Sequence, residues 1–266
     1  MVKISVAGAC GRMGSRIIYF LNKTPHVELT GTFDLPSDFF EGQDAGIVAG
    51  LGHIGIPIRT SVKESINGSN VLIDFTVPEA SIKTAEIASE AGINMVIGTT
   101  GFSSEHLKMI EYYSKQIAIV ISPNMSVGMN IMFKLVEEAA KLLGNEYDIE
   151  LFEIHHRLKK DAPSGTALKL ASVLASATGR NLDKDAVYER KGIIGPRTDS
   201  EIGIQSCRLG DVTGDHSVIF GTIGERLEIV HRAHNRDNFA LGAIKAAHWV
   251  ADKKPGLYGM NDVLGI

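Results

Sequence analysis

The chain has 266 residues, enough for one large domain or two modest ones with a substantial buried core. Hydrophobic residues make up 44% of it and charged residues 22%, which is ordinary for a globular protein, and no apolar run is long enough to span a bilayer. The formal net charge of −4 gives no electrostatic reason to expect a nucleic-acid partner, so we expect neither nucleic acid nor membrane as a partner.

In the first half of the chain, short β-type runs alternate with amphipathic stretches. We expect strands at residues 2–7, 27–33, 71–75, 93–97 and 117–121, and helices at about 12–22, 78–90 and 103–114. Residues 34–60 are rich in glycine and acidic side chains, which predicts a long loop with short pieces of structure. Strands that alternate with helices indicate a parallel sheet covered on both faces.

From about Met125 the pattern changes. Strands are expected at 149–154, 202–209, 212–222 and 226–233, and helices at 166–177, 238–251 and 128–143, the last with Ile131, Leu135, Ala139 and Leu142 on one stripe. Consecutive strands without helices between them predict an antiparallel or mixed sheet. The alanine-rich final helix can return to pack on the first domain. We therefore predict an α/β protein whose domains are 1–126 plus 236–266 and 127–235.

The two cysteines, Cys10 and Cys207, are far apart in the sequence. A disulfide framework or a cysteine-based zinc site is therefore not expected. The first residues form a strand at once and lack the charged-then-apolar pattern of a signal peptide. A cytoplasmic protein is the simplest interpretation.

A glycine-rich turn directly follows the first expected strand and opens the first helix. It consists of Gly8, Ala9, Cys10, Gly11, Arg12, Met13 and Gly14. Glycines here let the backbone approach a pyrophosphate, and the helix N-terminus supplies unpaired N–H groups and a favourable dipole. The G-x-x-G-x-x-G spacing is a variant of the usual dinucleotide-binding pattern. The alternative is a tight turn whose glycines serve packing only.

Asp34, at the end of the second expected strand, lies 20 residues after Gly14. A carboxylate at this place accepts hydrogen bonds from the adenosine ribose of a dinucleotide and repels the 2′-phosphate of NADP. The next residue, Leu35, offers no compensating charge, although Arg12 can still reach a phosphate. We predict that NADH serves at least as well as NADPH.

Three further turns follow successive strands of the predicted parallel sheet. They contain Phe75 and Thr76; Gly98, Thr99 and Thr100; and Ser122, Pro123, Asn124 and Met125. Ligands of open α/β sheets bind along the carboxyl edge, so these turns are candidates for holding the nicotinamide end of the cofactor. Each alone can be an ordinary loop, but together they support one another.

The segment 150–167, E-L-F-E-I-H-H-R-L-K-K-D-A-P-S-G-T-A, combines a proton donor, a cation and free N–H groups. Histidine titrates nearest to neutral pH, so His155 or His156 can deliver a proton. Lys159 adds a positive charge. Ser164 caps a helix whose first residues, Gly165 and Thr166, present an anion site. A small dicarboxylate that receives a hydride and a proton suits this set.

Three simpler interpretations apply to the same segment. The histidine pair can be merely exposed at a strand end, and Ser-Gly-Thr can be only a helix cap. A metal held by His155 and His156 with His231 and His234 is the third, but the spacing matches no known site and no cysteine assists. We therefore expect no metal. Asp161 is expected to orient the turn.

Residues 150–167 closely resemble the signature of bacterial dihydrodipicolinate reductases, E-x-x-E-x-H-x-x-x-K-x-D-x-P-S-G-T-A, at ten fixed positions. The likeness extends over the chain through G-A-C-G-R-M-G, D-F-T-V-P, G-T-T-G-F, S-P-N-M-S-V-G-M-N, G-D-H-S-V and F-A-L-G-A. Small departures from the family pattern are Leu158, Cys10 and Met125.

This resemblance implies a Rossmann-like dinucleotide-binding domain, completed by the C-terminal helix, and a mixed α/β domain for substrate binding and tetramer formation. It implies reduction of the cyclic product of dihydrodipicolinate synthase to tetrahydrodipicolinate with NADH or NADPH, on the diaminopimelate route to lysine. By position, His155 is the proton donor and Lys159 its partner, while His156, Ser164, Gly165 and Thr166 hold the substrate carboxylates. The glycine turn, Asp34 and the three strand-end turns hold the cofactor.

Two other functions stay open at this point. The chain can be a non-catalytic dinucleotide-binding sensor or scaffold, although a sensor has no need of a proton donor. It can also be another reductase of amino-acid biosynthesis, such as a homoserine or semialdehyde dehydrogenase. Those enzymes share the first domain but are not expected to carry the segment 150–167.

Overall fold

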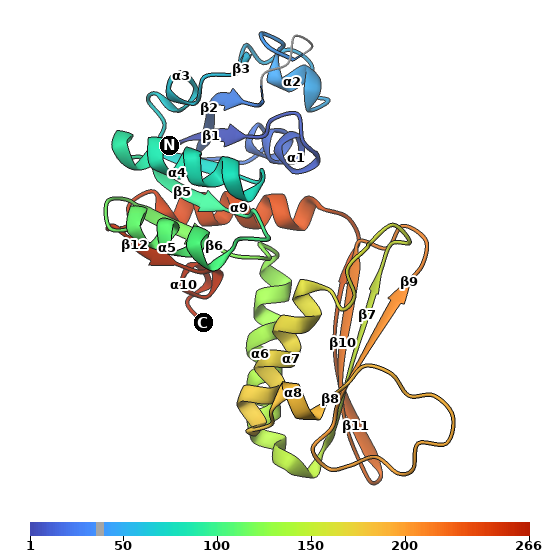
Figure 1. Cartoon of the computed structure of the whole chain (residues 1–266). Helices are drawn as coiled ribbons and strands as arrows, with labels where there is room; N and C mark the ends of the chain where they lie inside the picture. The colour runs from blue at the N-terminus through green and yellow to red at the C-terminus, as the bar shows by residue number, and fades with distance from the viewer. Residues whose placement is uncertain (36–39) are drawn as a thin grey trace. The chain divides into compact units, whose positions relative to one another are not determined.

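The computed structural model describes residues 1–35 and 40–266 (Figure 1). It divides into two compact units, which are described separately. Unit 1 comprises Met1–Val127 and Arg236–Ile266, and unit 2 comprises Gly128–Asn235. The C-terminal segment thus returns to the first unit. Of the loop expected at 34–60, residues 36–39 lie outside the described part.

Unit 1 is built on a seven-stranded sheet in which every pair of neighbours is parallel. In spatial order its strands are β12 (Gly256–Tyr258), β6 (Ala118–Ile121), β5 (Asn94–Ile97), β4 (Val71–Asp74), β1 (Val2–Ala7), β2 (Val27–Phe33) and β3 (Ile58–Arg59). From β1 the chain winds outwards in one direction through β2 and β3, and from β4 it winds in the other. The point of reversal therefore lies between β1 and β4, which is where open α/β sheets bind ligands.

Helices cover both faces of this sheet because its strands are apolar on both sides. They are α1 (Arg12–Leu21), α2 (Ala45–Val48), α3 (Val62–Ile66), α4 (Pro78–Ala91), α5 (Ser104–Tyr113), α9 (Asp237–Val250) and α10 (Met260–Leu264). In β4, Val71 and Ile73 join the core under α1 and α9, whereas Leu72 between them joins the core under α4 and α5. Successive residues point to opposite faces of a strand, so an unbroken apolar run is buried twice.

Several short elements of unit 1 were not predicted from the sequence. These are α3, β12 and α10, each of three to five residues, whereas α2 and β3 are short pieces of structure of the kind expected within residues 34–60. Elements this short carry too little periodicity to be recognised without their neighbours. The longer elements agree with the expected ranges to within about two residues at each end.

Unit 2 is a five-stranded mixed sheet with helices packed on one face. Its strands are β11 (Glu225–Ala233), β10 (Gly214–Thr222), β7 (Asp148–His155), β9 (Ile202–Arg208) and β8 (Ala186–Val187), in that spatial order. The pairs β11–β10 and β10–β7 are antiparallel, and β7–β9 and β9–β8 are parallel. The other elements are α6 (Val127–Leu143), a 3₁₀ turn at Gly144–Glu146, α7 (Gly165–Thr178) and α8 (Leu182–Asp185).

Helix α6 buries a different face from the stripe marked in the sequence. Met129, Met132, Val136 and Ala140 are buried against the sheet and α7. In the stripe, Ile131, Leu135 and Leu142 are 42%, 53% and 85% exposed. Both faces are apolar, so periodicity alone did not identify the one that packs on the sheet.

The fold is thus α/β, with a Rossmann-like parallel sheet and a second, mixed-sheet unit, as the sequence predicts. Within residues 1–35 and 40–266, none of the helices combines the length and the apolar character needed to cross a bilayer.

Candidate active site

The glycine turn lies at the carboxyl end of β1 and leads directly into α1. Gly8 has φ +66°, a conformation that side chains rarely adopt, and Gly11 is the N-cap of the helix. A Cβ added at Gly14 would lie 2.0 Å from the carbonyl oxygen of Gly8. The turn can close this tightly only because residues 8 and 14 are both glycine, Gly8 for its conformation and Gly14 for its lack of a side chain. It leaves the N–H groups of the first turn of α1 available for an anion.

Asp34 closes the turn from the end of β2. Its carboxylate accepts hydrogen bonds from the N–H of Cys10 at 2.7 Å and from the N–H of Leu35 at 2.8 Å. Burial and the neighbouring Asp34 carboxylate raise the pKa of the Cys10 thiol to about 12, so the thiol stays neutral. Ala9 is fully buried in the core. Its N–H donates to the carbonyl of Phe33 at 3.2 Å, so Ala9 shapes the turn and is not itself exposed to a ligand.

A hollow of about 420 Å³ opens beside this turn. It is lined by Gly8, Gly11, Phe33, Asp34, Leu35, Thr60, Val62, Phe75, Thr76, Val77, Ala80, Lys83 and Thr84. Phe75 follows β4, and Gly98 makes room for its ring, because a Cβ at Gly98 would lie 2.2 Å from the ring carbons. The residues after β1, β2 and β4 thus meet at one place, as the sequence predicts for the carboxyl edge of the sheet.

Asp74, at the end of β4, directly precedes the predicted turn with Phe75 and Thr76. It is fully buried, and burial raises the pKa of its carboxyl group despite hydrogen bonds from Thr76, Ser81 and Thr99. Thr76 donates to Asp74 Oδ1 from its backbone at 2.8 Å and from its hydroxyl at 2.6 Å, and the Thr99 hydroxyl lies 3.4 Å from the same oxygen. The hydroxyls of Thr76 and Thr99 therefore link the segments that follow β4 and β5 through the buried Asp74 carboxylate.

The turn after β6 is held by its own hydrogen bonds. The Ser122 hydroxyl donates to the carbonyl of Asn124 at 2.8 Å, and the Asn124 side chain accepts from the N–H of Ser126 at 2.9 Å. Met125 is buried in the core, where Gly242 of α9 packs against its carbonyl. Pro123 is exposed. Of this turn, Pro123 and the partly exposed Asn124 are the residues open to a ligand.

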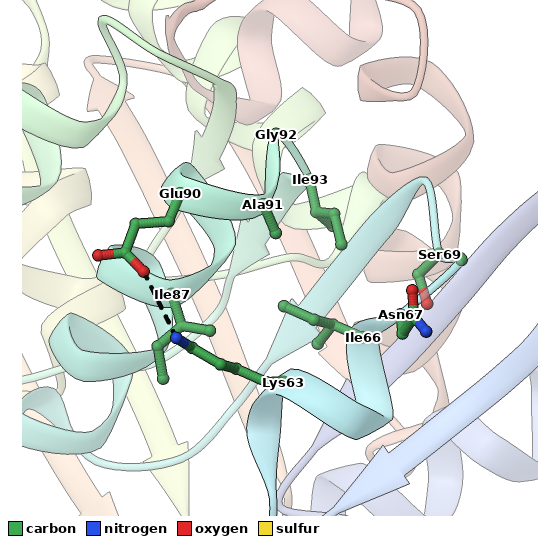
Figure 2. A pocket seen from close by; sticks show the side chains of 10 residues that line it. Lys63, Ile66, Asn67, Ser69, Ile87, Glu90, Ala91, Gly92 and Ile93 are labelled. Atoms are coloured by element: carbon green, nitrogen blue, oxygen red, sulfur yellow. Dashed lines mark ion pairs between the residues drawn. The ribbon is translucent and has the colours of Figure 1, made fainter.

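A second hollow of unit 1, also about 420 Å³, lies at the opposite edge of the sheet (Figure 2). Asn67 and Ser69 line it just before β4, and Ile93 lines it just before β5, so it belongs to the amino edge. Lys63 and Glu90 form an ion pair of 3.8 Å across it. This hollow does not contain any of the candidate site residues.

In unit 2, His155 is the last residue of β7 and is buried, with 9% of its surface exposed. Its Nδ1 forms a short hydrogen bond to Oε2 of Glu153, which lies two residues earlier on the same face of the strand. Glu153 is fully buried and also accepts two hydrogen bonds from Arg208 of β9, at 2.8 and 2.9 Å. Burial alone would raise the pKa of Glu153, but hydrogen bonds from His155, Arg208 and Ser206 hold the pKa well below its usual range.

Ser164 is the N-cap of α7, where its hydroxyl accepts from the N–H of Ala167 at 3.1 Å. The same hydroxyl lies 3.2 Å from Nε2 of His216, a buried histidine of β10. Burial, and next the nearby His155, lower the pKa of His216 to about 3, so this imidazole is neutral near physiological pH. The rings of His155 and His216 meet edge to face at 5.3 Å.

The remaining candidates lie around this buried group. Lys159 pairs with the carboxylate of Asp161 at 2.8 Å, and its side chain is 20% exposed. Gly165 and Thr166 form the first turn of α7, whose N–H groups are the expected anion site. His156, directly after β7, is partly exposed.

The four histidines considered for a metal are not brought together. His231 of β11 pairs in register with His216, on the row that includes Glu153. Within residues 1–35 and 40–266, no three His, Cys, Asp or Glu side chains form a group that could hold a metal ion.

Sequence reasoning missed Glu153, Arg208 and His216 as members of this site. The alternation of a strand puts Glu153 and His155 on one face, so that pair was accessible from the sequence. Arg208 becomes the neighbour of His155 only through the register of β7 with β9, and His216 that of Glu153 through β10. The sequence contains no sign of these registers.

The fold and the site define a two-domain α/β protein of the nicotinamide-dependent dehydrogenase and reductase class. Family models described as dihydrodipicolinate reductase N-terminus and C-terminus match residues 2–125 and 128–264. A 4-hydroxy-tetrahydrodipicolinate reductase of Syntrophus aciditrophicus is 52% identical over 100% of this chain and 99% of its own, and one of Citrifermentans bemidjiense is 49% identical over 100% of both. The chain therefore belongs to the dihydrodipicolinate reductase family.

Solved structures share the fold. A dipicolinate-bound dihydrodipicolinate reductase from Paenisporosarcina sp. TG-14 has a TM-score of 0.76 at 24% identity, covering 98% of this chain and 99% of its own. A diaminopimelate dehydrogenase of C. glutamicum has a TM-score of 0.55 at 14% identity, covering 97% and 92%. At these identities the likeness concerns the fold alone.

Proposed function

We propose that this protein reduces 4-hydroxy-tetrahydrodipicolinate, as dihydrodipicolinate, to tetrahydrodipicolinate with NADH or NADPH, in the diaminopimelate route of lysine biosynthesis. The observation that carries the proposal is the group at the end of β7. There His155, hydrogen-bonded to Glu153, lies beside the capped N-terminus of α7. A proton donor next to an anion site is what protonation of a carboxylate-bearing substrate requires. Family membership supplies the identity of that substrate.

The residues of unit 1 fit a dinucleotide. Gly14 of the glycine turn has no room for a side chain, and the N-terminus of the helix, at Gly11, lines the hollow that Asp34 and Phe75 also line. When bound, the nicotinamide cofactor supplies the hydride. We assign to the pyrophosphate the backbone of Gly8 and of Gly11 to Met13, and to the adenosine ribose Asp34. To the nicotinamide end we assign the turns with Phe75 and Thr76, Gly98 to Thr100, and Pro123 and Asn124, the last turn being held from inside by the buried Ser122 and Met125.

In unit 2, we assign proton donation to His155, with Lys159 as its partner. The N–H groups of Gly165 and Thr166, the Ser164 hydroxyl and His156 bind the two carboxylates of the substrate. The neutral His216 can accept from the Ser164 hydroxyl or donate to it from Nε2. Binding of a carboxylate by this hydroxyl requires the second arrangement, which leaves the hydroxyl hydrogen for the substrate. The domain divisions 1–126 plus 236–266 and 127–235 then correspond to cofactor binding and to substrate binding with assembly.

The choice between the two cofactors depends on Asp34. Its carboxylate faces the hollow with two backbone N–H groups already bound to it. A negative charge there accepts bonds from ribose hydroxyls and opposes a 2′-phosphate. We therefore propose that NADH is used at least as well as NADPH.

We further propose that four copies assemble through the face of the unit 2 sheet opposite α6 and α7, and that the enzyme acts in the cytoplasm. On that face, Phe152, Ser217 and Val230 form one row across three strands. Phe152 and Val230 are 38% and 42% exposed. Apolar side chains at the centre of a sheet face suit a symmetric subunit contact.

A coupled assay tests the reaction. The purified protein is mixed with freshly made product of dihydrodipicolinate synthase, and oxidation of NADH or NADPH is followed. Steady consumption that depends on the synthase supports the reductase. Cofactor binding without consumption would instead support the alternative, a sensor or scaffold on the same fold.

A further inference from the structure

Two charged side chains of unit 2 have no role in the assignments above. Glu153 is fully buried, and Arg208 binds it with both terminal nitrogens, Nη1 to Oε2 at 2.9 Å and Nη2 to Oε1 at 2.8 Å. Removing a carboxylate from water is costly, and the cost is offset only by good geometry and further hydrogen bonds. A pair of this kind therefore calls for an explanation beyond packing.

The first consequence of the pair concerns which nitrogen of His155 carries a proton. Oε2 of Glu153 is an acceptor, so Nδ1 of His155 keeps its hydrogen and Nε2 is the atom that can release one. Gly214 stands beside that atom, and a Cβ at this position would lie 3.0 Å from Nε2. Glu153 thus leaves Nε2 as the nitrogen that can release a proton, and the missing side chain of Gly214 leaves space beside it.

The second consequence concerns the segment that leads to α7. Oε1 of Glu153 accepts from the N–H of Ser164 at 3.2 Å, and Nη2 of Arg208 donates to the carbonyl of Asp161 at 2.6 Å. Asp161 in turn holds the Lys159 ammonium group at 2.8 Å. The Glu153–Arg208 pair therefore contacts His155 and Ser164 directly, and contacts Lys159 through Asp161.

The strands build this arrangement into the sheet. His155 of β7 and Arg208 of β9 are partners in the parallel register, and Glu153 lies on the same face two residues before His155. Backbone hydrogen bonds between β7 and β9 therefore fix the positions from which the three side chains extend.

We infer that Glu153 and Arg208 form a positioning pair, which keeps the hydrogen of His155 on Nδ1 so that the imidazolium form donates from Nε2, and which anchors Asp161 and Ser164 on either side of the substrate site. The inference rests on the proposed function. In the proton transfer, the N–H bond at Nε2 breaks, its electrons stay on Nε2, and the proton goes to the substrate. The Nδ1 hydrogen remains shared with Glu153, and the hydride comes from the nicotinamide cofactor.

The test compares Glu153→Gln with Glu150→Gln. Glu150 is a matched control, because it lies on the same strand and is also paired with arginines, Arg190 and Arg197, but it points to the other face. In Glu153→Gln we expect kcat to fall at least about tenfold, since a wrong tautomer disables such a histidine. KM for the cofactor should stay within about twofold, and Glu150→Gln should keep the wild-type kcat.

A spectroscopic measurement gives a second readout that does not require turnover. Long-range ¹⁵N–¹H correlation spectra of protein labelled at histidine nitrogens distinguish the two tautomers, with the His155 signals assigned by their loss in His155→Gln. Wild-type protein should show His155 protonated at Nδ1, and Glu153→Gln should show a mixture. Arg208→Lys, which keeps the charge but not the two-point contact, should lower kcat with the same small effect on cofactor KM.

An unchanged kcat and an unchanged tautomer in Glu153→Gln would overturn the inference. If the wild-type protein has no reductase activity, the proposed function fails, and the tautomer spectra still decide whether the pair sets the state of His155. Should Glu153→Gln not fold, Arg208→Lys carries the same test.

Discussion

The hydroxyl of Ser164 and Nε2 of His216 lie 3.2 Å apart in the interior of unit 2, where Ser164 also caps α7. A helix end that is expected to bind an anion is thus supported by an imidazole that stays neutral. The neutrality comes mainly from burial, which lowers the pKa of His216 to about 3. This has a direct consequence for the pH dependence of stability.

The free energy of unfolding should fall as the pH is lowered from about 6.5, the ordinary histidine value, towards 3. In that window the unfolded chain takes up a proton that folded His216 does not, so the slope from this group is about 1.4 kcal/mol per pH unit. Urea unfolding at pH 6.5 and pH 5 measures it. The unfolding free energy of His216→Gln should fall less steeply with decreasing pH than that of wild type. His234→Gln, changed at an exposed position, should keep the wild-type slope. Equal slopes in all three proteins would contradict the role of His216.

Replacement of His155 or Lys159 by alanine should lower kcat by about 10²- to 10⁴-fold, because proton transfer to the substrate loses its donor or the partner of that donor. Binding of NADH, followed by fluorescence titration, should be unaffected, since both residues belong to unit 2. Lys160→Ala, at an exposed neighbouring position, serves as the control. Near-full turnover in both variants would remove these residues from the mechanism.

Cofactor preference should follow the charge of Asp34. Wild-type protein should show a kcat/KM for NADH that equals or exceeds the value for NADPH. Asp34→Ser should shift the ratio towards NADPH by about tenfold, because one repulsive charge near the 2′-phosphate is worth on the order of 1.4 kcal/mol. Asp252→Ser, a change at a surface carboxylate, should leave the ratio alone. A strong NADPH preference in the wild type would be the contrary result.

Gly14→Ala should disrupt the cofactor turn. Its Cβ would lie 2.0 Å from the Gly8 carbonyl oxygen, so the turn or the start of α1 must shift. We expect NADH to bind at least about tenfold more weakly, a loss of about 1.4 kcal/mol or more. Gly221→Ala adds the same methyl group where no atom lies within 4 Å, and its NADH affinity should match wild type. Isothermal titration calorimetry compares the three proteins.

A charge at the centre of the open sheet face should prevent assembly. Phe152→Glu would place a carboxylate in the row that also contains Val230, and desolvating it in a subunit contact is unfavourable. Analytical ultracentrifugation should then show smaller species than the tetramer proposed for the wild-type protein. Leu142→Glu, which alters an 85% exposed apolar residue on α6, should leave the assembly intact. A tetrameric Phe152→Glu protein would place the interface elsewhere.

Local sequence patterns predicted most of the fold because most of it is locally encoded. The strand at Val2–Ala7, its glycine turn and α1 follow from composition and period, as do the capping signals of α5 and α7. The buried face of α6 did not follow, because its residues 131 and 132 are both apolar and only the partner surface selects between the faces they belong to.

Only the part of the candidate site that is close together in the sequence was predictable. His155, Lys159 and Ser164 occur within ten residues of one another, so their association is visible in the sequence. Glu153 and Arg208 are 55 positions apart and meet through strand register, as do Ser164 and His216. Register is set by long-range pairing, which a single sequence does not reveal. The candidate reactive groups could therefore be predicted from the sequence, whereas the side chains that contact them through strand register could not.

The return of α9 and β12 to the first sheet makes unit 1 discontinuous along the chain. During synthesis, residues 1–127 leave the ribosome without α9, which covers one face of β4, β5 and β6, and without the edge strand beside β6. Unit 2 is contiguous, so its folding needs no residue from 236–266. Cofactor binding should therefore be acquired last, so that a chain truncated after residue 235 would retain the fold of unit 2 but bind no NADH.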